Sequence, residues 1–302
     1  MWQDCQMQGR PLATELLAPF HEMTFSTDAA ATMQARLAGD GYLFLRDVLD
    51  RNEVAAARQE VFQRLSEVGE IAHPPSEGIY TGTSQRRQQC PDLGHFWQSV
   101  SEGAALRKLT HGAFIENVLS TIFGEPAHPH DYLFLRPAVP GRSTHLHYDY
   151  PFFARGSTAI HTVWTPLGDI PLSEGPLLVV ENSHHFSDLL SQAQAVDYQS
   201  NDTPLVQLME DPCELARSRN SRLLTADFHA GDLIVFSMNL LHGSLDNRSA
   251  SGRTRLSCDV RWQPATDPID PRYCGPNPPG TTGVGYGELN GAKPLDEPWH
   301  QR

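Results

Sequence analysis

The sequence has little positive charge. Lys108 and Lys293 are its only lysines, and the 23 lysines and arginines are outnumbered by 36 aspartates and glutamates, which leaves a net charge of −13 over 302 residues. Nucleic acids and anionic membranes are polyanions that are bound by basic protein surfaces. We therefore expect neither a nucleic-acid partner nor a membrane partner for this chain.

Long hydrophobic runs and paired cysteines are also scarce. No apolar run approaches the ~18 residues of a transmembrane helix. The polar segment 1–10 contains Asp4 and lacks the basic head and apolar middle of a signal peptide. The five cysteines are scattered without a Cys-x-x-Cys pair, which favours free thiols in a reducing compartment. The sequence thus predicts a cytoplasmic protein and leaves its oligomeric state open.

The secondary-structure signals change along the chain. Residues 25–70 have a helical pattern with one strand at 42–45, and Asp50 followed by Glu53 is a capping-box signal for a helix start. From about residue 130 to residue 263, short apolar or alternating runs separated by Pro and Gly predict strands. Short strands after a helical start indicate a mainly β fold with N-terminal helices, either a sandwich or a jelly roll.

We interpret residues 1–263 as a single domain whose β core spans about 130–263. The polar, turn-rich segment 70–100 is expected to form a loop that covers a site, and segment 185–225 is expected to be a helical or loop insertion. The tail, 264–302, is rich in Pro and Gly, so we expect no regular helix there and either a surface path or partial disorder. The expected strands of the core are Tyr132–Leu135, His145–Asp149, His161–Trp164, Leu177–Val180, Leu233–Phe236 and Leu256–Trp262.

The densest group of metal-capable side chains lies in segment 145–149. Alternate residues of a strand share a face, so His145, His147 and Asp149 would point the same way. A histidine and the aspartate, with a third ligand from another strand, would make a 2-His-1-carboxylate triad that leaves open positions on iron(II). With 14 histidines among 302 residues, roughly one His-x-Asp is expected by chance, so the motif needs support from its context.

That support comes later in the chain. His242 follows an apolar, strand-like run, and Arg253 and Arg255 come shortly after it. A second histidine completes a possible triad. An arginine beyond it can bind a carboxylate through two parallel hydrogen bonds and stays charged when it is buried.

In this order and spacing, residues from about 25 to 263 resemble the phytanoyl-CoA dioxygenase family of Fe(II)- and 2-oxoglutarate-dependent oxygenases. The segment Asp40-Gly41-Tyr42-Leu43 fits the family too. Asn182 departs from it, because a glycine usually precedes the Ser-His pair there, but this change concerns a turn and not the metal site. The matching motifs are His147-x-Asp149, Trp164-Thr165-Pro166-Leu167, Gly175-Pro176-Leu177, Asn182-Ser183-His184, Gly231-Asp232, His242-Gly243-Ser244, Asn247-x-Ser249 and Arg253.

The resemblance implies a double-stranded β-helix, that is, a cupin-like jelly roll, and a set of site residues. His147, Asp149 and His242 would be the iron ligands. Arg253, which we favour over Arg255, would form a salt bridge with the distal carboxylate of 2-oxoglutarate.

Three further residues complete the expected site. Ser244 would donate a hydrogen bond to the same distal carboxylate, and Trp164 would lie near the cosubstrate. Arg136 would either reach the cosubstrate or an anionic substrate, or form a structural ion pair.

The implied activity is the oxidation of an unactivated C–H bond in a small organic molecule, such as a natural-product intermediate. The enzyme would use Fe(II), 2-oxoglutarate and O2 and would release succinate and CO2. The outcome would be hydroxylation, desaturation or rearrangement. Radical halogenation is disfavoured, because a halide would need the coordination position that Asp149 occupies.

The sequence also allows another metal ligand and two other classes of protein. His145 could replace His147 as a ligand, although a supporting or pocket-lining role is favoured. A zinc hydrolase could use the same three ligands but would not need the arginine and serine placed as they are. A non-catalytic β-sandwich binding protein would not need the three ligands together.

Overall fold

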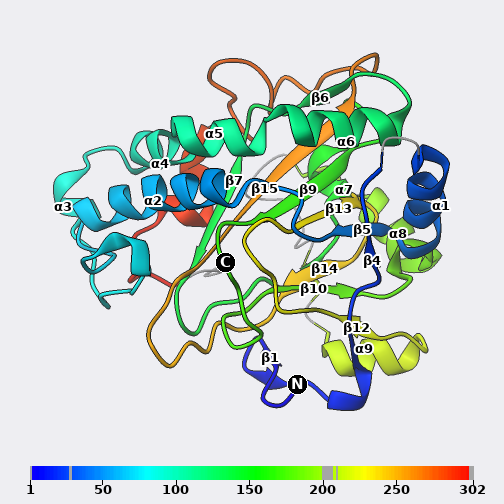
Figure 1. Ribbon diagram of the computed structural model, residues 1–302, viewed down its shortest axis with the longest axis horizontal. Coiled ribbons are helices and arrows are strands. Elements are labelled where there is room, and N and C mark those ends of the chain that lie inside the picture. The colour runs from blue at the N-terminus through cyan, green and yellow to red at the C-terminus, as the bar shows by residue number, and fades with distance from the viewer. Residues whose placement is uncertain (1, 27–28, 199–206, 209, 299–302) are drawn as a thin grey trace.

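The computed structural model describes residues 2–26, 29–198, 207–208 and 210–298, and it packs a larger β-sheet against a smaller one. Figure 1 shows helices α2 to α6 together on one side, with β10, β12 and β14 on the other side near β1 and α9. The predicted jelly roll with N-terminal helices is confirmed.

The larger sheet is antiparallel except for its parallel β4–β5 pair. The last strand, β15, pairs with β9 on one side and with both β6 and β7 on the other. The order is β4 (Glu22–Met23), β5 (Tyr42–Leu45), β13 (Leu233–Ser237), β9 (His161–Pro166), β15 (Arg255–Pro264) and β6 (Ala127–Pro129), and β7 (Phe134–Ala138) pairs with another part of β15.

The smaller sheet carries the two histidines of the expected triad on neighbouring strands, β8 and β14. Its order is β11 (Gln207–Leu208), β8 (Leu146–His147), β14 (His242–Ser244), β10 (Leu177–Val180), β12 (Leu223–Leu224) and β3 (Leu17–Ala18). A separate hairpin pairs β1 (Gln6–Met7) with β2 (Arg10–Pro11).

Strand β10 is apolar on both faces, because apolar side chains cover the smaller sheet on both sides. On β10, Leu177 and Val179 point into the space between the sheets, whereas Leu178 and Val180 join the cluster on the outer face. Aromatic residues such as Trp164 fill the inner space. This period of two is the pattern expected for strands between two apolar layers.

Helices cover the outer face of the larger sheet. The longest, α2, begins at the predicted cap, where Asp50 accepts hydrogen bonds from the backbone N–H groups of Asn52 and Glu53.

The α-helices of the whole described structure are α1 (Ala30–Asp40), α2 (Arg51–Glu67), α3 (Arg86–Gln89), α4 (Leu93–Ser101), α5 (Ala104–Thr110), α6 (Ala113–Phe123), α7 (Tyr150–Phe153), α8 (Ser187–Gln194) and α9 (Pro212–Ser218). The 3-10 helices are η1 (Thr14–Leu16), η3 (Pro75–Glu77), η4 (Ser183–His185), η5 (Gly285–Glu288) and η6 (Asn290–Ala292).

The expected loop at 70–100 is wrong, because this segment contains η3, α3 and most of α4. The Asp92 side chain caps α4 by accepting a hydrogen bond from the His95 N–H at 2.9 Å, and Phe96 and Trp97 are buried. The prolines and glycines of the segment mark turns between short helices. Segment 185–225 contains α8 and α9 as predicted, but it also supplies β11 and β12, and residues 199–206 and 209 lie outside the described structure.

The tail has no α-helix between residues 264 and 298, as predicted, and contains η5 and η6. Tyr273, Tyr286 and Leu295 are buried in the cluster that also contains residues of α2 and β15. The described part of the tail thus contributes to the core as well as to the surface. Residues 299–302 lie outside the described structure.

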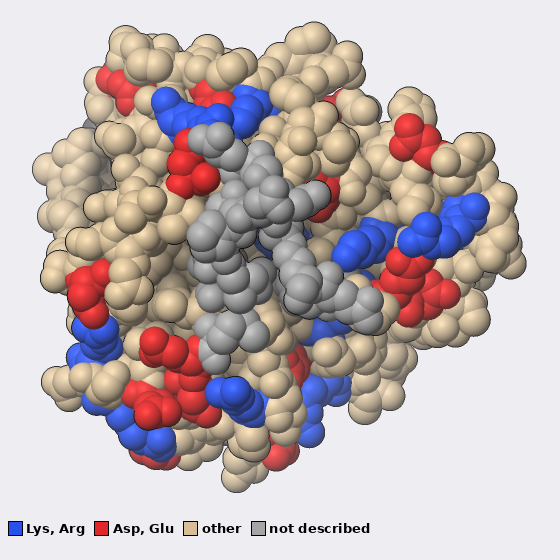
Figure 2. All heavy atoms as spheres, turned by 180° about the vertical axis from the view of Figure 1, so that it is seen from behind, with Lys and Arg blue, Asp and Glu red and all other residues tan. Residues whose placement is uncertain are grey.

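Two further properties of the fold concern its helices and its surface charge. Within the described residues, every helix is too short or too polar to cross a bilayer. On the face drawn in Figure 2, basic and acidic side chains lie next to one another in mixed groups.

Candidate active site

His147 and His242 lie side by side on adjacent strands of the smaller sheet. His147 on β8 and His242 on β14 are register partners, and their ring centroids lie 4.3 Å apart. Both side chains point into the space between the sheets and are buried, at 8% and 4% exposure. Strand pairing therefore brings together two imidazoles that are far apart in the sequence.

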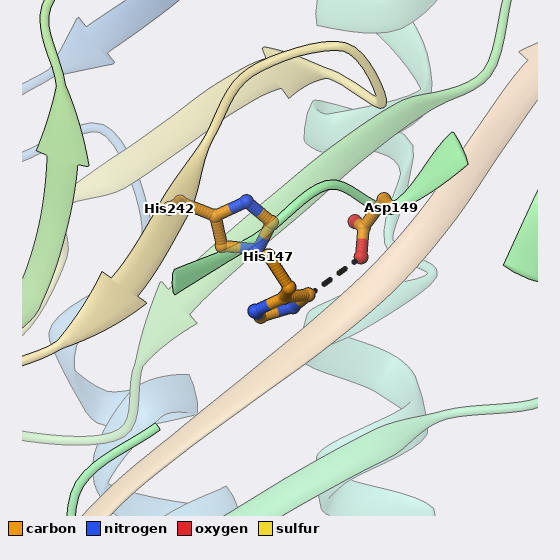
Figure 3. Close-up of side chains that lie close together, drawn as sticks. All are labelled: His147, Asp149 and His242. Carbon is orange, nitrogen blue, oxygen red and sulfur yellow. Dashed lines mark ion pairs between the residues drawn. The ribbon is translucent and has the colours of Figure 1, made fainter. Parts of the chain in front are cut away.

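Asp149 completes the cluster, but not by strand alternation as predicted. Strand β8 ends at His147, and Asp149 has φ −76° and ψ −20° at the N-terminus of α7, where Pro151 favours a helical turn. One ligand atom from each of His147, Asp149 and His242 lies within 4.8 Å of the others. Figure 3 shows the three side chains converging, with His147 Nε2 3.7 Å from Asp149 Oδ1. His145 is not part of this cluster and lines a separate cavity of about 550 Å³.

Backbone carbonyls orient both imidazole rings. His147 Nδ1 lies 2.9 Å from the His145 carbonyl, and His242 Nδ1 lies 3.0 Å from the Leu240 carbonyl. Because a carbonyl oxygen only accepts, each Nδ1 carries the proton and each Nε2 lone pair is available to a metal. Burial lowers the pKa of His147 to about 3 and also lowers the pKa of His242, so both rings are neutral at physiological pH.

The carboxyl group of Asp149 is ionised in this setting. Burial alone would raise its pKa, but the charge of the Arg261 guanidinium, together with the hydrogen bond from Thr162, holds the pKa well below its usual range. Arg261 Nη2 donates to both carboxylate oxygens, and the Thr162 hydroxyl donates to Oδ2 at 2.6 Å.

Two neutral imidazoles and one carboxylate suit a divalent iron ion. This is the 2-His-1-carboxylate set of non-haem Fe(II) oxygenases, in which positions on the metal stay open. The rings already expose Nε2 and the carboxylate is already ionised, so no proton needs to be displaced from the ligands for a metal to bind. The residues present thus fit the iron that the resemblance implies.

A buried cation lies in the same cavity as the histidines. Arg255, 2% exposed, lines this cavity with His147, Trp164, His242 and Ser244. Burial lowers the pKa of Arg255 to about 10, which leaves it charged at neutral pH. No carboxylate of the described residues lies within 4.0 Å of its guanidinium, which donates to the hydroxyls of Ser257 and Ser244.

The Ser244 hydroxyl is arranged to donate a hydrogen bond into this cavity. Its oxygen accepts hydrogen bonds from the Thr144 N–H at 2.8 Å and from Arg255 Nη2 at 3.2 Å. A hydroxyl has two lone pairs and one proton, so the proton remains for a ligand. Arg255 and Ser244 together form a cradle for an anion.

Arg253, which the sequence favoured as the cosubstrate ligand, does not line this cavity, whereas Arg255 does. Strand β15 begins at Arg255, and the chain before it turns at Gly252, which has φ +79°. The Arg253 side chain is 33% exposed and forms an ion pair with Glu174 at 3.3 Å. The alternation of β15 does not extend back to residue 253, and Arg255 is the arginine whose side chain lines the cavity.

The remaining two predicted residues lie in the cavity lining. Trp164 on β9 is buried at 3% exposure. Arg136 on β7 forms an ion pair with Asp259 on β15, which matches the structural alternative considered for it and still leaves it in the wall of the cavity.

Sequence reasoning missed the inward face of β15. Arg255, Ser257, Asp259 and Arg261 alternate with Leu256, Cys258, Val260 and Trp262, which pack into the outer core. Strict alternation in segment 255–262 was a readable signal. A buried strand with four polar side chains on its inner face indicates a polar site inside the sandwich.

A jelly roll with this triad and an adjoining anion cradle defines the class of non-haem iron oxygenases that use an oxo-acid cosubstrate. The family model of the phytanoyl-CoA dioxygenases (PhyH) matches residues 37–255. The chain belongs to the phytanoyl-CoA dioxygenase family, and it is an Fe(II)- and 2-oxoglutarate-dependent oxygenase. A zinc hydrolase and a non-catalytic binding protein do not fit a member of this family.

Relatives of this chain include two hydroxylases. The 1-deoxypentalenic acid 11-beta-hydroxylase of Streptomyces arenae is 24% identical over 238 residues, which are 75% of this chain and 78% of the relative. The homologue from Streptomyces exfoliatus is 22% identical over 265 residues, which are 84% and 88% of the two chains.

Solved structures share the fold. EctD from S. alaskensis has a TM-score of 0.55 and 19% identity over 88% of each chain. The epimerase SnoN from nogalamycin biosynthesis, in complex with Fe3+, alpha-ketoglutarate and nogalamycin RO, has a TM-score of 0.51 and 22% identity over 80% of this chain and 86% of its own.

Proposed function

We propose that this enzyme hydroxylates, or otherwise oxidises, an unactivated C–H bond of a natural-product intermediate. For hydroxylation the balance is R–H, O2 and 2-oxoglutarate giving R–OH, succinate and CO2. The observation that carries the proposal is the shared cavity, in which His147 and His242 lie beside the anion cradle of Arg255 and Ser244.

His147, Asp149 and His242 would hold the iron, which together with 2-oxoglutarate and O2 supplies the oxidant for C–H cleavage when it is bound. Arg255 would bind the distal carboxylate of 2-oxoglutarate through charge-assisted hydrogen bonds, with Ser244 donating a third. The deep burial of Arg255 excludes water and strengthens these contacts. Trp164 in the same wall would keep the cosubstrate in one orientation.

Asp149 favours oxidation over halogenation, because its carboxylate would take the coordination position on the iron that a halide would need. The named substrate of the S. arenae hydroxylase supports a natural-product intermediate of similar size as the substrate.

The cytoplasm is the compartment that we propose. All five cysteines are free, with Cys5, Cys213 and Cys258 buried, and thiols persist in a reducing environment. The acidic net charge of −13 argues against a polyanionic partner.

A succinate-release screen tests the proposal. Purified enzyme with Fe(II), 2-oxoglutarate and O2 is incubated with natural-product acids and their reduced precursors, and succinate and product mass are measured together. We expect one compound class to raise succinate above the background and to gain one oxygen or lose two hydrogens. His242→Ala should abolish both signals. Turnover that persists without iron or without 2-oxoglutarate would contradict the proposal.

A further inference from the structure

Arg261 is a buried partner of the predicted metal ligand Asp149. It lies on the inner face of β15 with a side chain that is 1% exposed, and its Nη2 lies 3.0 Å from Oδ1 and 2.9 Å from Oδ2 of Asp149. The guanidinium carbon lies 4.3 Å from the ring centre of Phe134 and 4.4 Å from that of Phe153. The two rings hold the guanidinium by cation–π contact and limit its movement.

The two oxygens of Asp149 are unequally engaged. Oδ2 accepts from the Thr162 hydroxyl at 2.6 Å and from Arg261 at 2.9 Å. Oδ1 accepts only the Arg261 contact among the described residues and lies on the side of His147 Nε2, 3.7 Å away. Each carboxylate oxygen has about two lone-pair sites, so Oδ2 is filled and Oδ1 keeps one site directed at the histidines.

Arg261 also forms an ion pair with Asp259. Asp259, two residues earlier on the same inner face, pairs with Arg136 and has its Oδ2 3.9 Å from Arg261 Nη1. Arg136, Asp259, Arg261 and Asp149 thus form a connected group of two cations and two anions. Because Asp259 and the aromatic rings hold it in place, Arg261 acts on Asp149 as a fixed donor.

We propose that Arg261 and Thr162 are positioning residues for Asp149, which engage Oδ2 so that the carboxylate binds the metal through Oδ1 alone. Single-oxygen binding leaves on the metal the position that a second carboxylate oxygen would take. The inference rests on the proposed function, since it takes the metal site as given, and it assigns roles to two residues outside the triad.

Metal binding is the direct test, because it requires neither substrate nor turnover. Mn(II) affinity is measured from the EPR signal of free Mn(II), and the visible absorption of bound Co(II) reports the coordination number. Partners that orient metal ligands typically contribute 10- to 100-fold to metal affinity. Arg261→Met should therefore weaken Mn(II) binding by about 10- to 100-fold, and Arg261→Lys, which keeps a donor, should recover part of this loss.

Thr162→Val removes only the hydroxyl and changes the shape of the side chain little. It tests the proposal even if the Arg261 variants do not fold. It frees a lone pair on Oδ2, so the Co(II) spectrum should shift toward a higher coordination number. Arg86→Met is the matched control. Arg86 is also fully buried, pairs with Glu70 at 2.5 Å and faces Phe96 and Trp97, but it is not among the residues around the triad.

The outcomes separate the two claims. Folded Arg261→Lys and Thr162→Val proteins with wild-type Mn(II) affinity and Co(II) spectrum would overturn the inference and leave the proposed function intact. Equal weakening of Mn(II) binding by Arg86→Met would also overturn it, because the effect would then be a general loss of stability. Wild-type protein that binds no divalent metal would overturn the proposed function itself.

Discussion

The guanidinium of Arg255 donates a hydrogen bond to the hydroxyl of Ser244 across a distance of 3.2 Å. Arg255 begins β15 of the larger sheet, whereas Ser244 ends β14 of the smaller sheet, two residues after His242. This single contact therefore joins the two sheets at the anion cradle and ties the cradle to the strand that carries a metal ligand.

Replacing Arg255 should impair cosubstrate binding far more than replacing Arg253. Hydrogen bonds to charged groups contribute about 1.5–3 kcal/mol each, so Arg255→Ala should raise the Kd of 2-oxoglutarate by about 10- to 100-fold or more. Arg253→Ala should change it by less than about threefold, because its exposed ion pair with Glu174 lies outside the cavity. Isothermal titration with 2-oxoglutarate on Mn(II)-loaded protein measures both. Equal effects would refute the assignment.

Removing the Ser244 hydroxyl should raise the Kd of 2-oxoglutarate less than removing the Arg255 side chain does. Ser244→Ala deletes one donor to the cosubstrate, which is worth about 1 kcal/mol, and should raise the Kd of 2-oxoglutarate about fivefold. Metal affinity should stay unchanged, because Ser244 is not among the three clustered ligand residues. A variant with wild-type cosubstrate affinity would show that the hydroxyl proton points elsewhere.

Breaking the buried ion pair between Glu70 and Arg86 should lower the free energy of unfolding. Glu70 accepts hydrogen bonds from Arg86, from the Ser84 hydroxyl and from the Leu295 N–H, and Arg86 donates to the carbonyls of residues 291–293. Glu70→Ala leaves a buried cation and should lower the free energy of unfolding by about 3–5 kcal/mol. Urea denaturation measures the loss.

The exposed Arg64–Glu67 pair is the control for this stability prediction. Its side chains are 40% and 46% exposed, so Arg64→Ala should cost less than about 1 kcal/mol. Similar losses for Glu70→Ala and Arg64→Ala would contradict the role that we assign to burial.

Stability should fall on acidification, partly because of His130. Burial lowers the pKa of this fully buried histidine from 6.5 to about 4. Between these values the unfolded chain binds a proton that the folded chain does not, so the contribution of His130 is complete above pH 6.5 and is lost as pH falls toward 4. At pH 5 the loss is roughly 2 kcal/mol.

Urea denaturation between pH 7 and pH 5 measures this dependence. His130→Gln should make it shallower, whereas the exposed His95, replaced in the same way, should leave it unchanged. An unchanged slope in the His130 variant would show that other groups cause the acid sensitivity.

The sequence predicted what depends on local pattern and missed what depends on strand boundaries. The convergence of His147, Asp149 and His242 was predictable because two of them are two residues apart and the third follows a clear strand. Which of Arg253 and Arg255 lines the cavity was not predictable, because it depends on the residue at which β15 begins, and a shift of two residues does not change the alternation pattern.

Helix α4 and the role of Arg261 were not predicted from the sequence. Helix α4 was hidden in a segment rich in Pro and Gly, although Asp92 marks its start. Arg261 was missed because charged residues in a strand are usually exposed, and only the packing of both sheets and the helices puts this face inside. The direct bonds of Arg261 and Thr162 to Asp149 are tertiary contacts between separate strands, which no local pattern encodes.

The most direct test of the account is an anaerobic titration of the protein with Fe(II) and then 2-oxoglutarate, followed by visible absorption. We predict a charge-transfer band that appears only when both are present. His242→Ala should lack the band, and Arg255→Ala should need far more 2-oxoglutarate to reach it. Folded wild-type protein with measured bound iron and saturating 2-oxoglutarate, but without the band, would contradict the account.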